Sequence, residues 1–335
     1  MDMNTAPTLD VISLGENMLR LSPPNHERIS QTATLEMRFG GAESNVALAL
    51  ARLGLRAGWL SRLPDNALGQ RVVAELNAQG VNTTGVRLAP GERLGTYFIE
   101  QGVAPRPNRM IYDRANSAFS NMRFADVALP LVDGARWLHI TGITAALNEG
   151  CRNMALKLVE YAHAAGLTVS FDVNYRALLW SPDQAQNGLL PILKNVDILF
   201  CAHRDAMSIF GVSADPLFGV QDLLGLSGGH TCVLTTGEEG AVAFSTKTSG
   251  TTKPMVDAIA VPGFKVSQVI DRVGAGDAFD AGFIAGQLRG LSLAESIRYG
   301  HACSALKITI PGDLALISAD EVELLLAGGG AASLR

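Results

Sequence analysis

The sequence predicts an α/β fold, a Rossmann-like and mostly parallel sheet sandwiched by helices. Short apolar runs alternate with amphipathic stretches of helical period, and a glycine follows these stretches where a helix would end. Composition agrees, because 335 residues with 47% hydrophobic and 18% charged side chains form a globular protein with a large core. Repeated alternation of strands and helices is typical of parallel sheets covered on both faces.

The core elements follow in chain order. Buried strands are expected at residues 9–14, 57–61, 137–141, 168–173, 196–200 and 232–234. Helices are expected at residues 44–53, 69–79 and 149–165, each followed by a glycine: Gly54, Gly80 and Gly166. The pattern assigns residues 1–15, 40–92 and 116–335 to one α/β core that binds the ligands.

Two segments interrupt this alternation, at residues 16–39 and 93–115. Both have the pattern of two strands joined by a turn, for instance at residues 96–99 and 109–112, with few helix signals. Hairpins inserted at two places in an α/β chain can share one small sheet. The sequence therefore predicts a β subdomain made of residues 16–39 and 93–115.

The strongest chemical signal is a glycine turn that opens a helix. Residues 271–286 read Asp-Arg-Val-Gly-Ala-Gly-Asp-Ala-Phe-Asp-Ala-Gly-Phe-Ile-Ala-Gly, which places Asp277 in the first helical turn. We expect the N–H groups of Gly274, Ala275 and Gly276 to form an anion site. An anion site beside a carboxylate base is what phosphoryl transfer to a hydroxyl requires.

Two other interpretations of this turn are weaker. A dinucleotide fingerprint fails because Phe279 stands where its third glycine should be, which argues against a nicotinamide dehydrogenase. Close helix packing, with Phe279 and Phe283 on one buried face, would explain the small residues. It would not explain a carboxylate directly after Gly-Ala-Gly.

Residues 271–279 resemble the signature of the ribokinase-like (PfkB) carbohydrate kinases, and residues 40–54 resemble the family's second, N-terminal signature. The resemblance implies a ribokinase-like fold, Asp277 as catalytic residue, and ATP with Mg²⁺; it leaves a monovalent cation open. In this family the small sheet is a lid that closes over the sugar and often pairs with another subunit. A homo-oligomer formed through the lid sheet is therefore expected.

The nucleotide side is expected at the loop of residues 235–240, which follows the strand at 232–234. Ligands of α/β proteins bind at such strand ends, although a glycine-rich loop there can also be a plain turn. With the resemblance, Thr235, Gly237 and Gly240 become nucleotide-binding candidates together with Gly274 and Gly276. The chain has no Walker A sequence.

The metal prediction rests on a departure from the family pattern. Many members carry Asn-x-x-Glu after the strand that corresponds to residues 196–200, and this motif helps to order magnesium through water. Here Ala202 replaces the amide and Asp205 keeps the carboxylate. The resemblance therefore implies only an indirect metal role for Asp205.

Two arginines indicate an acidic acceptor. Arg176 follows the strand at 168–173 and Arg114 closes the second hairpin, and the planar guanidinium binds carboxylates in a bidentate way. The structural alternative is an ion pair with Asp172 or Asp113.

Several motifs resemble the 2-keto-3-deoxygluconate kinases of the family: Gly-Ala-Glu-Ser-Asn at 41–45, Leu-Pro-Asp-Asn at 63–66, Asn-Tyr-Arg-x-Leu-Leu-Trp at 174–180 and Pro-Gly-Asp at 311–313.

That resemblance implies ATP-dependent phosphorylation of the terminal hydroxyl of 2-keto-3-deoxygluconate, giving 2-keto-3-deoxy-6-phosphogluconate. Gly40, Gly41 and Asn45 would bind acceptor hydroxyls. The acid end would be held by Tyr97, Tyr112, Arg114 and Arg176. A fructokinase or another sugar kinase of the family is the alternative, and a non-catalytic sugar- or nucleotide-binding protein is a further one.

Composition also excludes several classes of protein. A net charge of −5 argues against nucleic-acid binding, where a basic surface is expected. No apolar run reaches membrane-spanning length, and the first residues lack a signal-peptide pattern. The four scattered cysteines fit neither a zinc site nor a disulfide framework. A cytoplasmic protein is expected.

Overall fold

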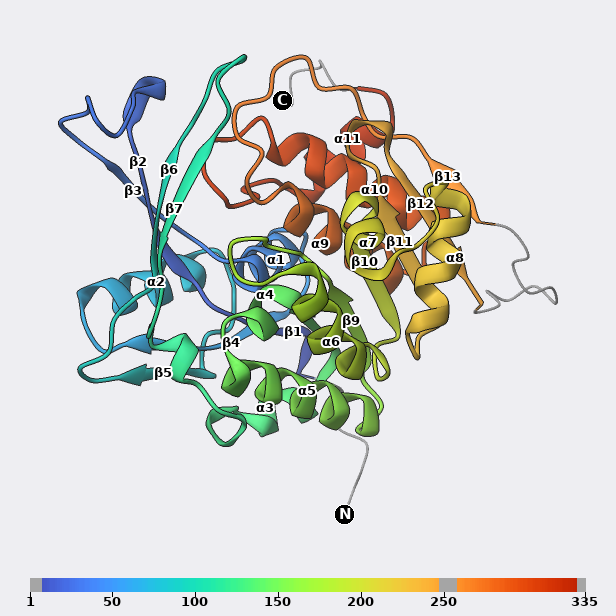
Figure 1. Cartoon of the computed structure of the whole chain (residues 1–335), viewed down its shortest axis with the longest axis horizontal. Helices are drawn as coiled ribbons and strands as arrows, with labels where there is room; N and C mark the ends of the chain where they lie inside the picture. Colours follow the sequence, from blue (N-terminus) through green and yellow to red (C-terminus); the bar gives the residue numbers. More distant parts are fainter. Residues whose placement is uncertain (1–7, 247–257, 330–335) are drawn as a thin grey trace.

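A sheet of nine strands forms the centre of the computed structural model, which describes residues 8–246 and 258–329 (Figure 1). In spatial order the strands are β13 (Ile259–Val261), β12 (Ala241–Ser245), β11 (Thr231–Thr235), β10 (Ile198–Ala202), β9 (Thr168–Asp172), β8 (Ala135–Thr141), β1 (Leu9–Leu14), β4 (Ala57–Pro64) and β5 (Val86–Ala89). From β11 to β5 every neighbouring pair is parallel. Strands β12 and β13 run antiparallel at one edge.

Helices cover both faces of this sheet. One face packs against α1 (Ala42–Arg52), α2 (Ala67–Ala78), α9 (Ala275–Leu288), α10 (Leu293–Lys307) and α11 (Ala319–Leu326). The other packs against α3 (Leu129–Asp133), α4 (Gly142–Ala146), α5 (Glu149–Ala164), α6 (Pro182–Leu193), α7 (His203–Phe210) and α8 (Pro216–Leu226). Strand side chains alternate between the two cores, as Val11 and Ile12 do, because successive residues of a strand point to opposite faces.

A separate sheet of four strands projects from this core (Figure 1). Its order is β3 (Glu36–Gly40), β2 (Met18–Ser22), β6 (Thr96–Glu100) and β7 (Arg109–Asp113). Each hairpin is antiparallel, and the two hairpins join through a parallel pairing of β2 with β6. We call this sheet, with its turns, the lid.

The predicted α/β fold with a mostly parallel sheet and a second small sheet is confirmed. The antiparallel β12 and β13 were not predicted, because short apolar runs carry no sign of strand direction. The division between core and lid at the stated residues stays a prediction. Of the predicted core, residues 1–7, 247–257 and 330–335 lie outside the described residues.

The sheet topology gathers the site. Strands β9, β10 and β11 end at Asp172, Ala202 and Thr235, and parallel strands end at one edge of their sheet. Helix α9 begins at this edge, after a turn at Gly274. All four cysteines are buried and free, and no helix in the described ranges has the length and apolar character to cross a bilayer.

Candidate active site

A cavity of about 420 Å³ lies between the lid and the carboxyl edge of the large sheet. It brings together most of the residues that the sequence predicts for catalysis, acceptor and metal: Gly40, Gly41, Asn45, Tyr97, Tyr112, Arg114, Arg176, Asp205, Thr235, Gly274, Ala275, Gly276 and Asp277. These residues come from both sheets and both signature motifs. We call this space the acceptor cavity.

A second cavity of about 570 Å³ adjoins it and contains the two remaining candidates, Gly237 and Gly240. Thr235, Ala275 and Gly276 line both cavities. The start of helix α9 is therefore where two ligands, one in each cavity, would meet. We call the second space the nucleotide cavity.

The turn before α9 has the backbone of an anion site. Gly274 has φ 83°, and a Cβ there would lie 2.1 Å from the carbonyl oxygen of Asp313, so only glycine fits. A Cβ on Gly276 would meet no atom of the described residues within 4 Å, which leaves its backbone open to a ligand. First-turn N–H groups have no acceptor inside their helix, although that of Ala275 bends back to the Arg272 carbonyl at 3.3 Å. The open N–H groups are thus mainly those after Ala275.

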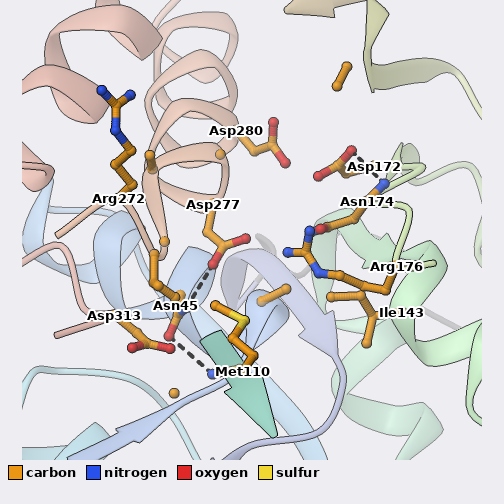
Figure 2. Close-up of a pocket in the computed structure, with 18 of the residues that line it drawn as sticks. Asn45, Met110, Ile143, Asp172, Asn174, Arg176, Arg272, Asp277, Asp280 and Asp313 are labelled. Carbon is orange, nitrogen blue, oxygen red and sulfur yellow. Dashed lines mark hydrogen bonds between the residues drawn. The ribbon is translucent and has the colours of Figure 1, made fainter. Parts of the chain in front are cut away.

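Asp277 lies in the first turn of α9 and is 8% exposed. Its Oδ2 accepts a hydrogen bond of 2.7 Å from Asn45 Nδ2 (Figure 2). Burial raises the pKa of Asp277 to about 6, and the Asn45 hydrogen bond opposes that rise. Asn45 Oδ1 in turn accepts from Gly41 N at 3.2 Å, so the Gly41 N–H, predicted to bind the acceptor, is already used. This carboxyl group can act as a base near neutral pH.

Two more carboxyl groups lie beside Asp277 and were not predicted. Asp280 is one helical turn further along α9, and Asp172 ends β9 opposite it (Figure 2). Burial raises the pKa of Asp172 to about 7 and that of Asp280 well above its usual value, and the nearby carboxylates of Asp172 and Asp277 raise the pKa of Asp280 further. Asp280 therefore favours its protonated form at neutral pH.

Arg176 is the open cation of the acceptor cavity. It is exposed, and its guanidinium extends into the cavity towards Asp277 (Figure 2). In the described ranges no carboxylate oxygen lies within 4 Å of it, and its one hydrogen bond, of 3.5 Å, is to the Tyr175 carbonyl. The alternative of a pair with Asp172 or Asp113 fails for Arg176; Asp113 pairs with Arg93 at 2.6 Å.

Arg114 differs, because it forms a buried ion pair with Glu16. Its Nε donates to Glu16 Oε2 at 2.9 Å and its Nη2 to the same oxygen, with side-chain exposures of 8% and 2%. The guanidinium also lies 5.6 Å from the centre of the Tyr112 ring. A structural pair therefore exists at Arg114, but with a glutamate that the sequence analysis did not consider.

The two tyrosines also differ. Tyr97 is 3% exposed and donates its hydroxyl hydrogen to Asp313 Oδ2 at 2.5 Å, and burial raises its pKa well above the usual value. It stays a neutral donor, and its hydroxyl is already bonded to Asp313. Tyr112 is half-buried, and among the described residues its hydroxyl has only Met110 Sδ as partner, at 3.5 Å. Tyr112 is the tyrosine with a hydroxyl available to a ligand.

Asp205 lines the acceptor cavity, half-buried, with Arg204 Nε 3.4 Å from its carboxylate. Burial raises the pKa of Asp205. Between residues 8 and 246 and between 258 and 329, no three His, Cys, Asp or Glu side chains gather as a metal cage. A single carboxylate suits Mg²⁺ that is held mainly by phosphate oxygens and water.

The nucleotide cavity is lined by apolar residues such as Phe264, Phe279 and Ile308 and also by the charged residues Lys265 and Arg272. His301 also lines it; this side chain is 8% exposed, and burial lowers its pKa to about 4, so the ring is neutral. In the described part of the chain, His301 Nε2 has no hydrogen-bond partner. Aromatic and apolar side chains beside a few polar ones are typical of a small-molecule site.

Comparisons with known proteins decide the family. The "pfkB family carbohydrate kinase" model matches residues 8–319. The chain belongs to this family. It is 41% identical over 324 residues to the 2-dehydro-3-deoxygalactonokinase of Haloferax volcanii, covering 97% of this chain and 98% of that one. It is 32% identical over 308 residues to the 2-dehydro-3-deoxygluconokinase of Bacillus subtilis, covering 91% of each.

A solved structure gives the same result. The 2-dehydro-3-deoxygluconokinase of Thermotoga maritima superposes with a TM-score of 0.84 at 34% identity, covering 96% of this chain and all of the other. Plant fructokinases are more distant relatives of this pfkB-family kinase. The resemblance inferred from the two signature motifs is confirmed, as is the assignment to carbohydrate kinases.

Proposed function

We propose that this kinase transfers the γ-phosphoryl group of ATP to the terminal hydroxyl of a 2-keto-3-deoxy sugar acid (2-dehydro-3-deoxy in systematic naming), first of all 2-keto-3-deoxygluconate. One observation carries the proposal: the cavity that holds Asp277 beside an open anion turn also holds Arg176, a guanidinium with no carboxylate partner in the described ranges. A neutral sugar would give that guanidinium no carboxylate to bind, whereas a sugar acid would pair with it.

Asp277 acts as the base in this proposal. It takes the proton of the acceptor hydroxyl while the hydroxyl oxygen attacks the γ-phosphorus and the bond to the β-phosphate oxygen breaks. A pKa near 6 leaves most of Asp277 ionised at pH 7 and closer to the operating pH than an ordinary aspartate. Asn45 fixes the carboxylate through its 2.7 Å hydrogen bond.

The turn at 274–276 and the first N–H groups of α9 stabilise the negative charge that spreads over the transferred phosphoryl oxygens. Gly276 allows close approach because nothing lies within 4 Å of where its Cβ would be. Thr235, Gly237 and Gly240 line the nucleotide cavity and bind ATP from the other side. Bound Mg²⁺ would neutralise phosphate charge, and Asp205 would hold it indirectly through water.

The acceptor lies between two walls. Arg176 pairs with the carboxylate of the acid, Arg114 donates from the nitrogen that Glu16 leaves free, and the Tyr112 hydroxyl donates as well. Gly40 and Gly41 border the hydroxyls; a Cβ on Gly41 would lie 1.9 Å from the Glu16 carbonyl oxygen, so the backbone must pass close there. Tyr97 contributes its ring.

The test is ADP release from Mg-ATP with 2-keto-3-deoxygluconate, 2-keto-3-deoxygalactonate, fructose and ribose as acceptors, with Asp277→Asn as control. We expect turnover that depends on Asp277 and is confined to the two keto acids. Turnover with fructose instead would keep the kinase and remove the carboxylate site, which is the fructokinase alternative. No turnover on any acceptor would favour a binding protein.

Further parts of the proposal concern assembly and location. The lid exposes Met37, Ile111 and Val103 at 38%, 56% and 55%, which supports a homo-oligomer formed through the lid sheet. Sedimentation of the purified chain, with Ile111→Lys as control, measures the oligomeric state.

The proposal also includes a lid made of residues 16–39 and 93–115 that closes on the sugar acid. It includes a cytoplasmic location as well, supported by four buried free cysteines. Binding of a dissolved monovalent cation is tested by adding K⁺ to the assay.

A further inference from the structure

Lys307, the last residue of helix α10, is fully buried at 0% exposure. Its ammonium donates to the main-chain carbonyl oxygen of Asp271 at 2.9 Å. Burial lowers the pKa of Lys307, while the carboxylates of Asp271 and Asp313 raise it. A lysine is almost never fully buried without a partner for its charge, and the proposed mechanism gives this one no task.

Asp271 is the anchor of the turn that precedes α9. Its Oδ2 accepts from Arg20 Nη2 at 2.6 Å, from Gln101 Nε2 at 2.8 Å and from Gly312 N at 3.1 Å. Its Oδ1 accepts from Val273 N at 3.1 Å, next to Gly274. With its carbonyl held by Lys307, every oxygen of Asp271 is engaged, so the path of the chain into the anion turn is fixed.

Lys307 reduces an excess of negative charge around this anchor. Arg20 bridges two carboxylates, Asp271 at 2.6 Å and Asp313 at 2.5 Å, and all three side chains are 5% exposed or less. Asp277 is a third buried carboxylate on the same side, and the positive charge of Lys307 lowers its pKa. Arg20 and Lys307 together supply two positive charges against three negative ones, before any phosphate enters.

We propose that Lys307 is a built-in monovalent cation for the anion turn. Its ammonium holds the Asp271 carbonyl and puts a positive charge beside the chain that leads into Gly274, so the chain needs no dissolved K⁺ or similar ion there. Lys307 is a positioning residue, because its contact is with Asp271, three residues before Gly274. The inference rests on the proposed function in one respect, that the anion at the turn is a phosphate of the nucleotide.

The first arm of the test uses the wild-type chain. Affinity for a non-hydrolysable Mg-ATP analogue is measured by calorimetry, and turnover is measured beside it, at constant ionic strength with tetramethylammonium or K⁺ as the cation. We expect both quantities to agree within about twofold, because only general screening changes. A strong activation by K⁺ would overturn the inference. The binding measurement needs no acceptor, so failure of the sugar-acid assignment leaves this arm intact.

The second arm compares Lys307→Met with Lys307→Ala. Methionine fills the space without charge, whereas alanine leaves room for a small cation. We expect both variants to bind the analogue about tenfold to a hundredfold more weakly, because a buried carbonyl loses a charged donor and the anion turn loses a countercharge. Added K⁺ or NH₄⁺ should restore binding to Lys307→Ala and leave Lys307→Met unchanged.

A purely structural lysine would give a different pattern. Thermal unfolding would shift in both variants while the affinity of the folded protein for the analogue stayed at the wild-type value and K⁺ had no effect. That result would refute the inference. Should neither variant fold, the wild-type comparison of K⁺ with tetramethylammonium decides alone.

Discussion

The two walls of the acceptor cavity are built differently. On the lid wall two polar side chains are already paired, Arg114 with Glu16 and Tyr97 with Asp313. On the core wall two groups are open: in the described ranges Arg176 has no carboxylate within 4 Å, and no atom lies within 4 Å of where a Cβ on Gly276 would be. The sequence gives Arg114 and Arg176 the same expected role, and only their surroundings separate them.

This difference teaches where binding free energy can come from. A paired buried arginine has lost its water and gained a partner, so its net charge towards a ligand is small. An open arginine gives its full charge to an incoming carboxylate. Substitutions on the core wall should therefore change kinetics and leave the fold intact, whereas substitutions on the lid wall should reduce stability.

The largest effect is expected for Asp277→Asn on the core wall. Loss of the base should lower kcat by about 10²–10⁴-fold, since Asn cannot accept the hydroxyl proton. ATP affinity should stay near wild type because the side chain keeps its size, and the thermal midpoint at pH 7 should hold or rise because Asn removes a buried charge. Single-turnover kinetics and calorimetry check this. A variant with nearly wild-type kcat would remove Asp277 from its role.

The glycine turn is also the part of the site that sequence reasoning predicts best, and the reason is local. A carboxylate in the first turn after Gly-Ala-Gly is a feature of neighbouring residues, as are the apolar runs of β1 and β8. Asp280 could have been found in the same way, because it lies three residues after Asp277 on one helix face.

Pairing across the chain could not be predicted in this way. Glu16 is separated from Arg114 by 98 positions and Arg20 from Asp271 by 251, and nothing in either local pattern selects the partner. The parallel register of β2 with β6, which brings the hairpins together, is equally non-local. The sequence therefore predicts which residues line the cavity better than which of them are free to bind.

On the lid wall, the largest loss of stability is expected for Arg114→Met. It leaves Glu16 buried without its cation, which should lower the free energy of unfolding by about 3–5 kcal/mol. The double variant Arg114→Met with Glu16→Gln should recover most of that loss, since no charge remains uncompensated. Denaturant unfolding of both checks the coupling. Equal free energies of unfolding for the single and double variants would show that the loss of stability does not come from the unpaired Glu16.

Gly276→Ala tests the open space on the core wall. The new methyl meets no protein atom within 4 Å, and alanine favours a helix over glycine, so stability should rise by up to about 1 kcal/mol. The same methyl stands where the phosphoryl group approaches, so kcat/KM should fall by about 10²-fold through displacement. Thermal unfolding measures the expected rise in stability, and steady-state kinetics measure the expected fall in kcat/KM. A parallel fall in both would mean that the glycine serves packing.

Arg176→Ala should raise KM for the keto acid by about tenfold to a hundredfold, because it removes the cation that pairs with the carboxylate of the acid. Arg176→Lys should recover part of the loss, since it keeps the charge but not the fork. Steady-state kinetics with a keto acid and with fructose separate the contributions. Equal losses on both acceptors would contradict the carboxylate contact.

The smallest effect expected is the pH dependence of the wild type. Burial raises the pKa of Asp277 to about 6, and only the ionised form is a base, so kcat/KM should fall about tenfold per pH unit below 6 and level off above it. The stability effect has the opposite sign. A carboxyl whose pKa is raised on folding stabilises the fold while protonated, below its unfolded value, and that contribution is lost as pH rises through about 6. Asp277→Asn should remove both dependences, and Asp172→Asn should move the kinetic limb to lower pH, because the two carboxyls repel each other when ionised. A limb that persists in Asp277→Asn would belong to another group.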